Sequence, residues 1–383
     1  EQFADAGAEI LATNTFNAQA SSVAGVTYDP SALVVTVTST PAGATVINTV
    51  TVSYIAASHN AFAGILGKQT LTIGGSSQAT SNAAPNINFY LMLDSSPSML
   101  IAQTDEISAM RALTPKQDSG AGCAFACHET NPASENPALG NPNYPKGNPL
   151  AGQMMDNYAI ARANNITLRI DLLVQAIQNL VSTAQQTASS ANAQYQMAIY
   201  SFDLGLNTIQ TLTSNLTLAQ SQASNINVRE VYVNNYLTQN NKNSDEDTNF
   251  DTAFTQINSI MPNPGNGTNA AGDSPQEVLF IVTDGMEDEN VGGTRTYAFT
   301  AGNTCTAIKN RGIRIAILYT YYSTLPTDSF YNTNVAQYQP GVATSMQNCA
   351  SPNLYLEADS DTNISSYLKS LFQTAVTTAY LSK

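Results

Sequence analysis

The sequence predicts a mixed α/β fold, in which a mostly parallel, doubly wound sheet is covered by helices on both faces and follows a small β-rich unit. Three observations predict this class. Strand-like apolar runs alternate with helical patterns over about 300 residues. These runs are too apolar to have one face in water, which indicates burial on both sides. The first 80 residues differ, because their apolar and polar residues alternate with the period of a half-exposed strand.

Composition narrows the class of function. The chain of 383 residues has 14 basic and 28 acidic residues, and its net charge of −14 excludes a general binder of nucleic acid. Charged residues make up 11% of the chain, against about 25% in an average globular protein. Asn, Ser, Thr, Gln and Tyr therefore supply the polar surface, which is typical of a secreted or surface-exposed protein.

The N-terminal unit, residues 1–80, combines one helix with a β-meander or hairpin. Residues 1–19 are rich in Ala and predict a helix. Alternating runs separated by Pro and Gly predict strands at 32–40, 46–56 and 69–73. Residues 76–85 are small and polar and end in Pro85, so we interpret them as a linker.

The second domain, residues 86–383, carries the α/β pattern. Short apolar runs predict buried strands at 86–93, 196–202, 277–283, 313–319 and 354–357. Apolar residues at helical spacing predict helices at 167–187, 249–260, 301–310 and 364–380. A long insertion at about 100–165 follows the first strand. The insertion begins at the carboxyl end of that strand, which is the edge of the sheet where such folds bind ligands. We therefore expect the insertion to lie near a functional site.

The apolar runs, the first residue and the cysteines of the chain indicate in which compartment the protein acts. No run of about 18 apolar residues occurs, so the sequence predicts no membrane span. The chain starts at Glu1 without Met, and we expect a processed precursor with an anchor segment ahead of it. The four cysteines suggest two disulfides, Cys123–Cys127 and Cys305–Cys349, and paired cysteines favour an oxidising compartment.

Three polar motifs fall at one edge of the predicted sheet. Asp94, Ser96 and Ser98 directly follow the first buried strand, Asp284 follows the third, and Thr248 lies just before a predicted helix. Taken alone, the first motif could equally be a turn, since Asp, Ser and Pro are common in turns. Together, carboxylates and hydroxyls without His or Cys form a hard-oxygen site, which suits Mg²⁺, Mn²⁺ or Ca²⁺ rather than zinc.

These motifs resemble the metal-ion-dependent adhesion site of von Willebrand factor A domains, with D-x-S-x-S after the first strand, a later Thr at a helix start and T-D-G after another strand. Asp94, Ser96, Ser98, Thr248 and Asp284 match its five ligand positions. The resemblance implies the Rossmann-like fold of these domains and one bound divalent cation, either Mg²⁺ or Ca²⁺, with Mn²⁺ as a third candidate. It also implies an open coordination position, which a carboxylate of a partner protein fills.

The similarity extends to the TadG-like group, surface proteins of tight-adherence pili that carry a von Willebrand A domain. GCAFACH at 122–128, NNITLRIDLLVQA at 164–176, IKNRGIRIAILYTYY at 308–322 and CASP at 349–352 look like segments of that group. FADAGAEILA and AFAGILGKQTLTI resemble the pilin-like portion that follows its membrane helix. The resemblance therefore implies an extracellular protein of the bacterial cell surface or pilus, with a pilus subunit as one expected partner.

A second hypothesis rests on Cys123, Cys127 and His128. With one residue more between the cysteines than in C-x-x-C-H, this segment could be a variant attachment site for c-type haem in an electron carrier. His128 would be one axial ligand, and His59, the other histidine of the chain, would be the second. The simpler alternative is a disulfide in a loop beside an incidental histidine.

No enzymatic constellation accompanies the metal motif. None of the three ligand motifs contains His, no Gly-rich phosphate loop follows the first strand, and no G-x-S-x-G segment occurs. We therefore expect a non-enzymatic adhesion protein that uses a metal ion to hold a partner's carboxylate. A structural filament subunit that assembles with its own copies is a further alternative. The acidic runs 245–247 and 287–289 flank the expected site, either as solvated loops, as aids to cation capture or as ligands of a second ion.

Overall fold

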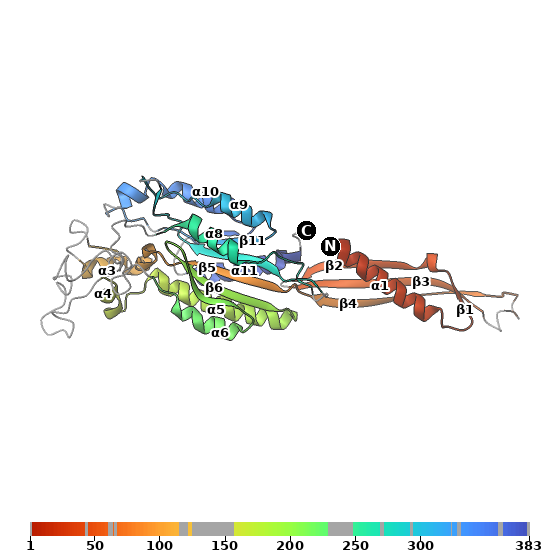
Figure 1. Cartoon of the computed structure of the whole chain (residues 1–383). Helices are drawn as coiled ribbons and strands as arrows, with labels where there is room; N and C mark the ends of the chain where they lie inside the picture. Colours follow the sequence, from red (N-terminus) through yellow and green to blue (C-terminus); the bar gives the residue numbers. More distant parts are fainter. Residues whose placement is uncertain are drawn as a thin grey trace. The chain divides into compact units, whose positions relative to one another are not determined.

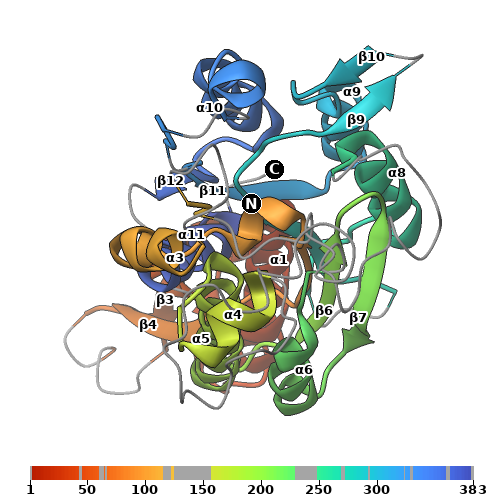
Figure 2. The same cartoon turned by 90° about the vertical axis from the view of Figure 1, so that its left-hand side faces the viewer.

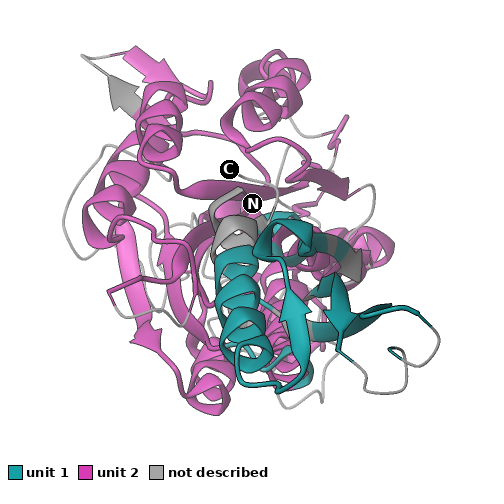
Figure 3. Ribbon diagram, turned by 90° about the vertical axis from the view of Figure 1, so that its right-hand side faces the viewer, with its two compact units in different colours: residues 1–84, 190–193, 376–383 teal, residues 85–189, 194–375 magenta. Residues whose placement is uncertain are grey.

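A computed structural model describes residues 2–42, 45–59, 64, 67–114, 122–124, 157–228, 248–268, 272–291, 294–322, 324–327, 331–358 and 363–380. The chain divides into two compact units (Figure 3). Unit 1 comprises residues 1–84, 190–193 and 376–383, and unit 2 comprises residues 85–189 and 194–375. Within the described ranges, no helix is both long and apolar enough to cross a membrane.

Unit 1 is one helix packed on an antiparallel sheet (Figure 1). Its elements are α1 (Gln2–Ala20), β1 (Val26–Tyr28), the 3-10 turn η1 (Pro30–Ala32), β2 (Val34–Ala42), β3 (Thr45–Ser58) and β4 (Leu71–Ala83). β3 is central, with β4 along one edge and both β1 and β2 along the other. The ring of Phe16 on α1 lies 5.3 Å from that of Tyr28 and 5.1 Å from that of Tyr54, so aromatic contacts hold the helix on the sheet.

The linker expected at 76–85 is wrong for most of its length. Residues 76–83 continue β4 and pair with β3, from Ser76 opposite Ser53 to Ala83 opposite Val46. An edge strand tolerates this small, polar sequence, because only one side of its backbone needs a partner strand. The described side chains of this stretch are exposed, so hydrogen bonding to β3 rather than burial forms the strand.

Unit 2 is built around a six-stranded sheet. The strand order is β12 (Tyr355–Ala358), β11 (Arg314–Thr320), β8 (Gln276–Thr283), β5 (Ile87–Asp94), β6 (Tyr195–Phe202) and β7 (Leu206–Thr213). Every neighbouring pair is parallel except β6 with β7, which adds an antiparallel edge strand that the sequence did not predict. All residues of β5 and β8 are buried, which explains their continuous apolar runs. The predicted mixed α/β class with a mostly parallel sheet is confirmed.

Helices cover both faces of this sheet (Figures 1 and 2). The helices that lie wholly or mostly in unit 2 are α3 (Ile107–Leu113), α4 (Asn157–Ala163), α5 (Arg169–Ala191), α6 (Leu216–Gln222), α8 (Phe250–Ile260), α9 (Gly302–Asn310), α10 (Gln339–Cys349) and α11 (Ile364–Thr377). One face packs against α8, α9 and α10, and the opposite face against α5, α6 and α11. On the second face, the ring of Phe372 on α11 lies 5.2 Å from that of Phe89 on β5.

The insertion leaves and rejoins the fold at one short contact. Ala102 and Leu168 form an antiparallel bridge, and the N–H of Gln103 donates to the carbonyl of Thr167 at 2.9 Å. The helices α3 and α4 lie near the two ends of the insertion, where the sequence predicted no helix, and face the viewer in Figure 2. The bridge closes the base of the insertion directly before α5 begins.

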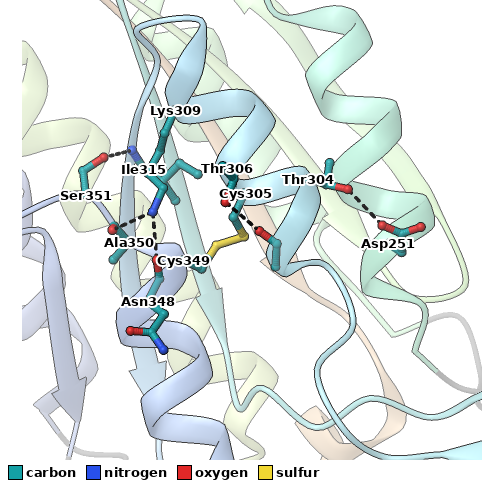
Figure 4. The surroundings of a disulfide bond; sticks show 11 residues. Asp251, Thr304, Cys305, Thr306, Lys309, Ile315, Asn348, Cys349, Ala350 and Ser351 are labelled. Atoms are coloured by element: carbon teal, nitrogen blue, oxygen red, sulfur yellow. Dashed lines mark hydrogen bonds between the residues drawn. A yellow bond between two sulfur atoms is a disulfide. The ribbon is translucent and has the colours of Figure 1, made fainter.

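A disulfide joins two helices of unit 2 (Figure 4). Cys305 on α9 and Cys349 at the end of α10 form the predicted pair, with Cα atoms 5.3 Å apart. Nζ of Lys309 donates to the carbonyl of Asn348 at 2.8 Å, so the same two helices are also tied by a hydrogen bond. Cys127 lies outside the described residues, and its disulfide with Cys123 stays a prediction.

Candidate metal centre

The sheet topology brings the two predicted carboxylate ligands to one place. Asp94 ends β5, and Asp284 directly follows β8. β6 follows β5 in the chain and lies on one side of it, whereas β8 lies on the other side, so the strand order reverses between β5 and β8. Loops that leave the carboxyl ends of strands diverge at such a point, which is where doubly wound sheets commonly bind ligands.

Three of the predicted ligands form one hydrogen-bonded cluster. Oδ1 of Asp94 accepts from the N–H of Ser96 at 2.9 Å and from its hydroxyl at 2.5 Å. The hydroxyl oxygens of Ser96 and Ser98 are 2.9 Å apart. Pro97 begins the 3-10 turn η2 (Pro97–Leu100), and its fixed φ suits the first position of such a turn. The turn curls the chain so that the hydroxyl of Ser98 reaches that of Ser96, which bonds the carboxylate.

Thr283 links the ends of the two strands. Its hydroxyl donates to Oδ2 of Asp94, the carboxylate oxygen that Ser96 does not bond, at 2.5 Å. The same hydroxyl accepts from the N–H of Gly285 at 2.8 Å, which fixes the turn on which Asp284 lies. The sequence showed Thr283 only as part of the T-D-G motif, and its role as a cross-link follows from the parallel pairing of β5 with β8.

The site has the charge that a divalent cation needs. The side chains of Asp94 and Asp284 are fully buried. Burial and the neighbouring charge of Asp284 raise the pKa of Asp94 above its usual range, and hydrogen bonds from Ser96 and Thr283 offset part of this rise. A cation between two such carboxylates would relieve their repulsion, and hydroxyl and carboxylate oxygens are ligands that Mg²⁺ and Ca²⁺ accept. The donor set therefore fits the predicted ion.

The fifth predicted ligand lies beside the loop that follows Asp284. Thr248 is 2% exposed, and its backbone exchanges hydrogen bonds of 3.1 and 3.0 Å with Asp288. The next residue, Asn249, caps α8 by accepting from the N–H of Thr252 at 2.8 Å. Thr248 is therefore held in place by the helix cap on one side and by the backbone bridge on the other.

A buried arginine beside Asp284 was missed by the sequence analysis. Nη1 of Arg169, the first residue of α5, lies 3.4 Å from Oδ2 of Asp284, and both side chains are fully buried. Nη2 donates to the carbonyls of Thr320 at 3.2 Å and Tyr321 at 3.1 Å, at the end of β11. Arg169 lies in the segment at 164–176 that resembles the TadG-like group, but that resemblance assigns it no role. In the helical pattern at 167–187 it is one of two charged residues, with Asp171, among apolar ones.

The acidic run at 287–289 is buried rather than solvated. Glu287 is fully buried, and its carboxylate accepts from the N–H of Phe250 at 3.0 Å. Asp288 forms a two-pronged ion pair with Arg295, with Oδ1 2.5 Å from Nε and Oδ2 2.6 Å from Nη2. These carboxylates tie the start of α8 to the hairpin of β9 (Glu289–Val291) and β10 (Thr294–Thr296). Among the described residues, no group of three or more His, Cys, Asp or Glu side chains could hold a metal.

The haem hypothesis receives no test from the described residues. Cys127 and His128 lie outside them, as does the acidic run 245–247. His59 lies in unit 1, where its Nε2 is 2.8 Å from the hydroxyl of Thr27, whereas Cys123 belongs to unit 2. The attachment of haem stays a prediction.

Comparisons with known proteins assign no family. No protein-family model matches the sequence, and no curated protein matches it. Among solved structures, the chain is similar to proximal thread matrix protein 1 from the mussel byssus (10% identity, TM-score 0.40, 77% of this chain and 49% of that one). It is also similar to BatB from Bacteroides thetaiotaomicron, with 13% identity and a TM-score of 0.36 over 76% of this chain and 98% of that one. A third similar structure is the PilB minor pilin from Streptococcus sanguinis, with 9% identity and a TM-score of 0.41 over 91% of this chain and 79% of that one. The chain spans about half the length of the mussel protein. Likenesses this weak carry no conclusion about function.

Proposed function

We propose that unit 2 is a von Willebrand A-like domain that binds one divalent cation and, through it, a carboxylate of a partner protein. Asp94, Ser96, Ser98, Thr248 and Asp284 would hold the ion, which would be Mg²⁺ or Ca²⁺, with Mn²⁺ as a third candidate. The observation that carries the proposal is the hydrogen-bonded cluster of Asp94 with the two serines, which shares the strand-order reversal with Asp284.

The ligand types favour partner binding over metal storage. Three of the five proposed ligands are neutral hydroxyls, so the two carboxylates alone bring charge to the ion. A cation held in this way keeps an attraction for one more carboxylate, which is the chemistry it would supply when bound. Ser98 is partly exposed, whereas Asp94, Ser96 and Asp284 are buried, so an approaching partner would reach the site from the side of Ser98.

The proposed place of action is the bacterial cell surface or a pilus, as a non-enzymatic adhesion protein. Two features support an extracellular location. The disulfide between Cys305 and Cys349 is typical of oxidising compartments. The low content of charged residues, 11%, leaves a surface of uncharged polar side chains. A partner subunit of the same pilus or a ligand on another surface would supply the carboxylate.

Metal binding is tested by thermal unfolding of the chain in EDTA and then in excess Mg²⁺, Ca²⁺ or Mn²⁺. An ion that binds only the folded state stabilises it by about 2.7 kcal/mol at a hundredfold excess over its dissociation constant. Asp284→Asn should remove this metal-dependent shift. The matched control is Asp273→Asn, which changes a carboxylate outside the site that is hydrogen-bonded to Asn266 and Thr268 in its own loop. The control should keep the shift, whatever its own stability in EDTA.

Two results would refute the metal site: no shift of the parent protein with any of the three ions, or an unchanged shift in Asp284→Asn. The open coordination position has its own test. Tb³⁺, a hard cation that prefers oxygen ligands, is loaded into the site and its luminescence lifetime is measured with and without acetate. Acetate should lengthen the lifetime by displacing a bound water, and an unchanged lifetime would argue against carboxylate binding.

A further inference from the structure

A fixed positive charge already lies beside the proposed metal site. We propose that Arg169 is the resident counter-charge of Asp284, and through it of the pair of carboxylates that Asp284 forms with Asp94. Without a metal it offsets their repulsion, and with a metal it lowers the affinity for the cation while raising the attraction for an anionic partner. The second half of this inference rests on the proposed function, whereas the first half concerns the metal-free protein and does not.

The position of the guanidinium carries this inference. Nη1 lies 3.4 Å from Oδ2 of Asp284, and the side chain of Arg169 is fully buried, so water does not screen the charge. Nη2 is held by the carbonyls of Thr320 and Tyr321 at 3.2 and 3.1 Å. These contacts hold the guanidinium in place, so a cation bound by Asp284 would share that carboxylate with Arg169.

The backbone of Arg169 is held by a hydrogen bond as well. The N–H of Arg169 donates to the carbonyl of Ile101 at 3.1 Å, next to the bridge of Ala102 with Leu168. Ile101 directly follows the turn η2, which carries Ser98. The base of the insertion therefore sets the arginine against the same segment that supplies the hydroxyl ligands.

The net charge of the site differs between its metal-free and its metal-bound state, and this charge determines which ions or groups the site attracts. When Asp94 and Asp284 are both ionised, the empty site and Arg169 together have one negative charge, which attracts a divalent cation less than two uncompensated carboxylates would. With the cation bound, the site has one positive charge and attracts an anionic group. Without Arg169, the same metal-bound site would be neutral. The expected partner chemistry is therefore an acidic side chain or a C-terminal carboxylate.

The proposed role of Arg169 in the metal-free protein is tested by thermal unfolding in EDTA. Arg169→Gln leaves the two carboxylates uncompensated, so the melting temperature should fall by about 8 °C or more. Adding Asp284→Asn to this variant removes one of the repelling charges and should restore at least about half of the loss. A double variant that is no more stable than Arg169→Gln would mean that the arginine only bonds the carbonyls, which overturns this half. If Arg169→Gln does not fold, a double variant that folds supports the proposal, and one that fails to fold overturns it.

The proposed effect of Arg169 on the affinity for the cation is tested by calorimetric titration with Mn²⁺. Arg169→Gln should bind Mn²⁺ at least about tenfold more tightly than the parent, because a like charge has been removed from the site. Arg169→Lys keeps the charge and should stay within about threefold of the parent. The control is Arg162→Gln, which breaks the surface ion pair of Arg162 with Asp171 and should change neither affinity nor stability appreciably.

The outcomes separate the two proposals. Equal or weaker binding of Mn²⁺ by Arg169→Gln, or much tighter binding by Arg169→Lys, would overturn the role of the arginine while the metal site stands. If neither the parent nor Arg169→Gln binds Mn²⁺, both the proposed function and the proposed effect of Arg169 on metal binding are overturned. The comparison in EDTA would still decide whether Arg169 is the counter-charge of the empty site.

Discussion

Asn88 on β5 and Glu277 on β8 form a buried hydrogen bond near the start of the two strands that lead to Asp94 and Asp284. Nδ2 of Asn88 lies 2.8 Å from Oε1 of Glu277, whose side chain is 1% exposed. Burial raises the pKa of Glu277 to about 7, and the bond from Asn88 and the charge of Arg311 offset only part of this rise. The folded protein therefore holds a proton here at pH values where the unfolded chain has lost it.

This proton makes stability depend on pH. Between the ordinary pKa of 4.5 and the raised value of about 7, the folded state binds more protons at Glu277 than the unfolded state. The free energy of unfolding therefore falls as the pH rises through this window. Glu277→Gln mimics the protonated group and should raise the free energy of unfolding by about 1–3 kcal/mol at pH 8, with little change at pH 4.

Urea unfolding at pH 4, 6 and 8 in EDTA measures this difference. The control is Glu9→Gln on the exposed side of α1, which should follow the parent at every pH. If the parent and Glu277→Gln lose stability in parallel as the pH rises, the buried carboxyl is not the source of the dependence.

The disulfide between α9 and α10 should be a main contributor to the stability of unit 2. Cys305 and Cys349 are 44 positions apart, and closing a loop of that length stabilises by about 4 kcal/mol in the chain-entropy model. The double variant Cys305→Ala with Cys349→Ala should lose roughly that amount in urea unfolding. Reductant should destabilise the parent but not the double variant. Equal sensitivity to reductant in both proteins would place the effect at another pair of cysteines.

Gly285 should tolerate no side chain. Its φ is +72°, and a Cβ atom there would overlap Cγ1 of Val342 and lie 3.2 Å from Cε of Met346, both on α10. Gly285→Ala should destabilise by about 2–4 kcal/mol, from the left-handed backbone and the clash together. Gly272→Ala separates the two causes, because Gly272 has a φ of +86° and a Cβ atom there would meet no atom within 4 Å. Similar losses of melting temperature in both variants would mean that the contact with α10 costs nothing.

Thr248 should act through its hydroxyl. Thr248→Val keeps the buried volume and the backbone bridge with Asp288 but removes the proposed ligand. We expect Mn²⁺ binding to weaken about tenfold or more, equivalent to about 1.4 kcal/mol, with little change of stability in EDTA. Thr248→Ser retains the hydroxyl and should bind close to the parent value. A valine variant with parental affinity would remove Thr248 from the ligand set. Calorimetric titration of the three proteins side by side decides between these results.

The local sequence determined those features that depend on short stretches of chain. The continuous apolar runs of β5 and β8 predicted buried strands, because burial on both faces leaves no position for regular polar alternation. Asp94, Ser96 and Ser98 lie within five positions of one another, so one tight turn suffices to bring their oxygens together. The edge strand β7 escaped prediction, because its half-buried residues show no clear alternation.

Only the tertiary structure decided which distant segments meet. Residues 76–83 read as a linker by composition, yet β3 supplies the hydrogen bonds that make them a strand. The acidic run at 287–289 could be a solvated loop or an aid to cation capture by its sequence, yet its side chains are buried and Phe250 and Arg295 bond two of its carboxylates. Arg169 lies 115 positions before Asp284, and no local pattern predicts their contact. Hydrophobic periodicity determines which side chains are buried, whereas the partner of a buried polar group depends on how the elements are connected and packed.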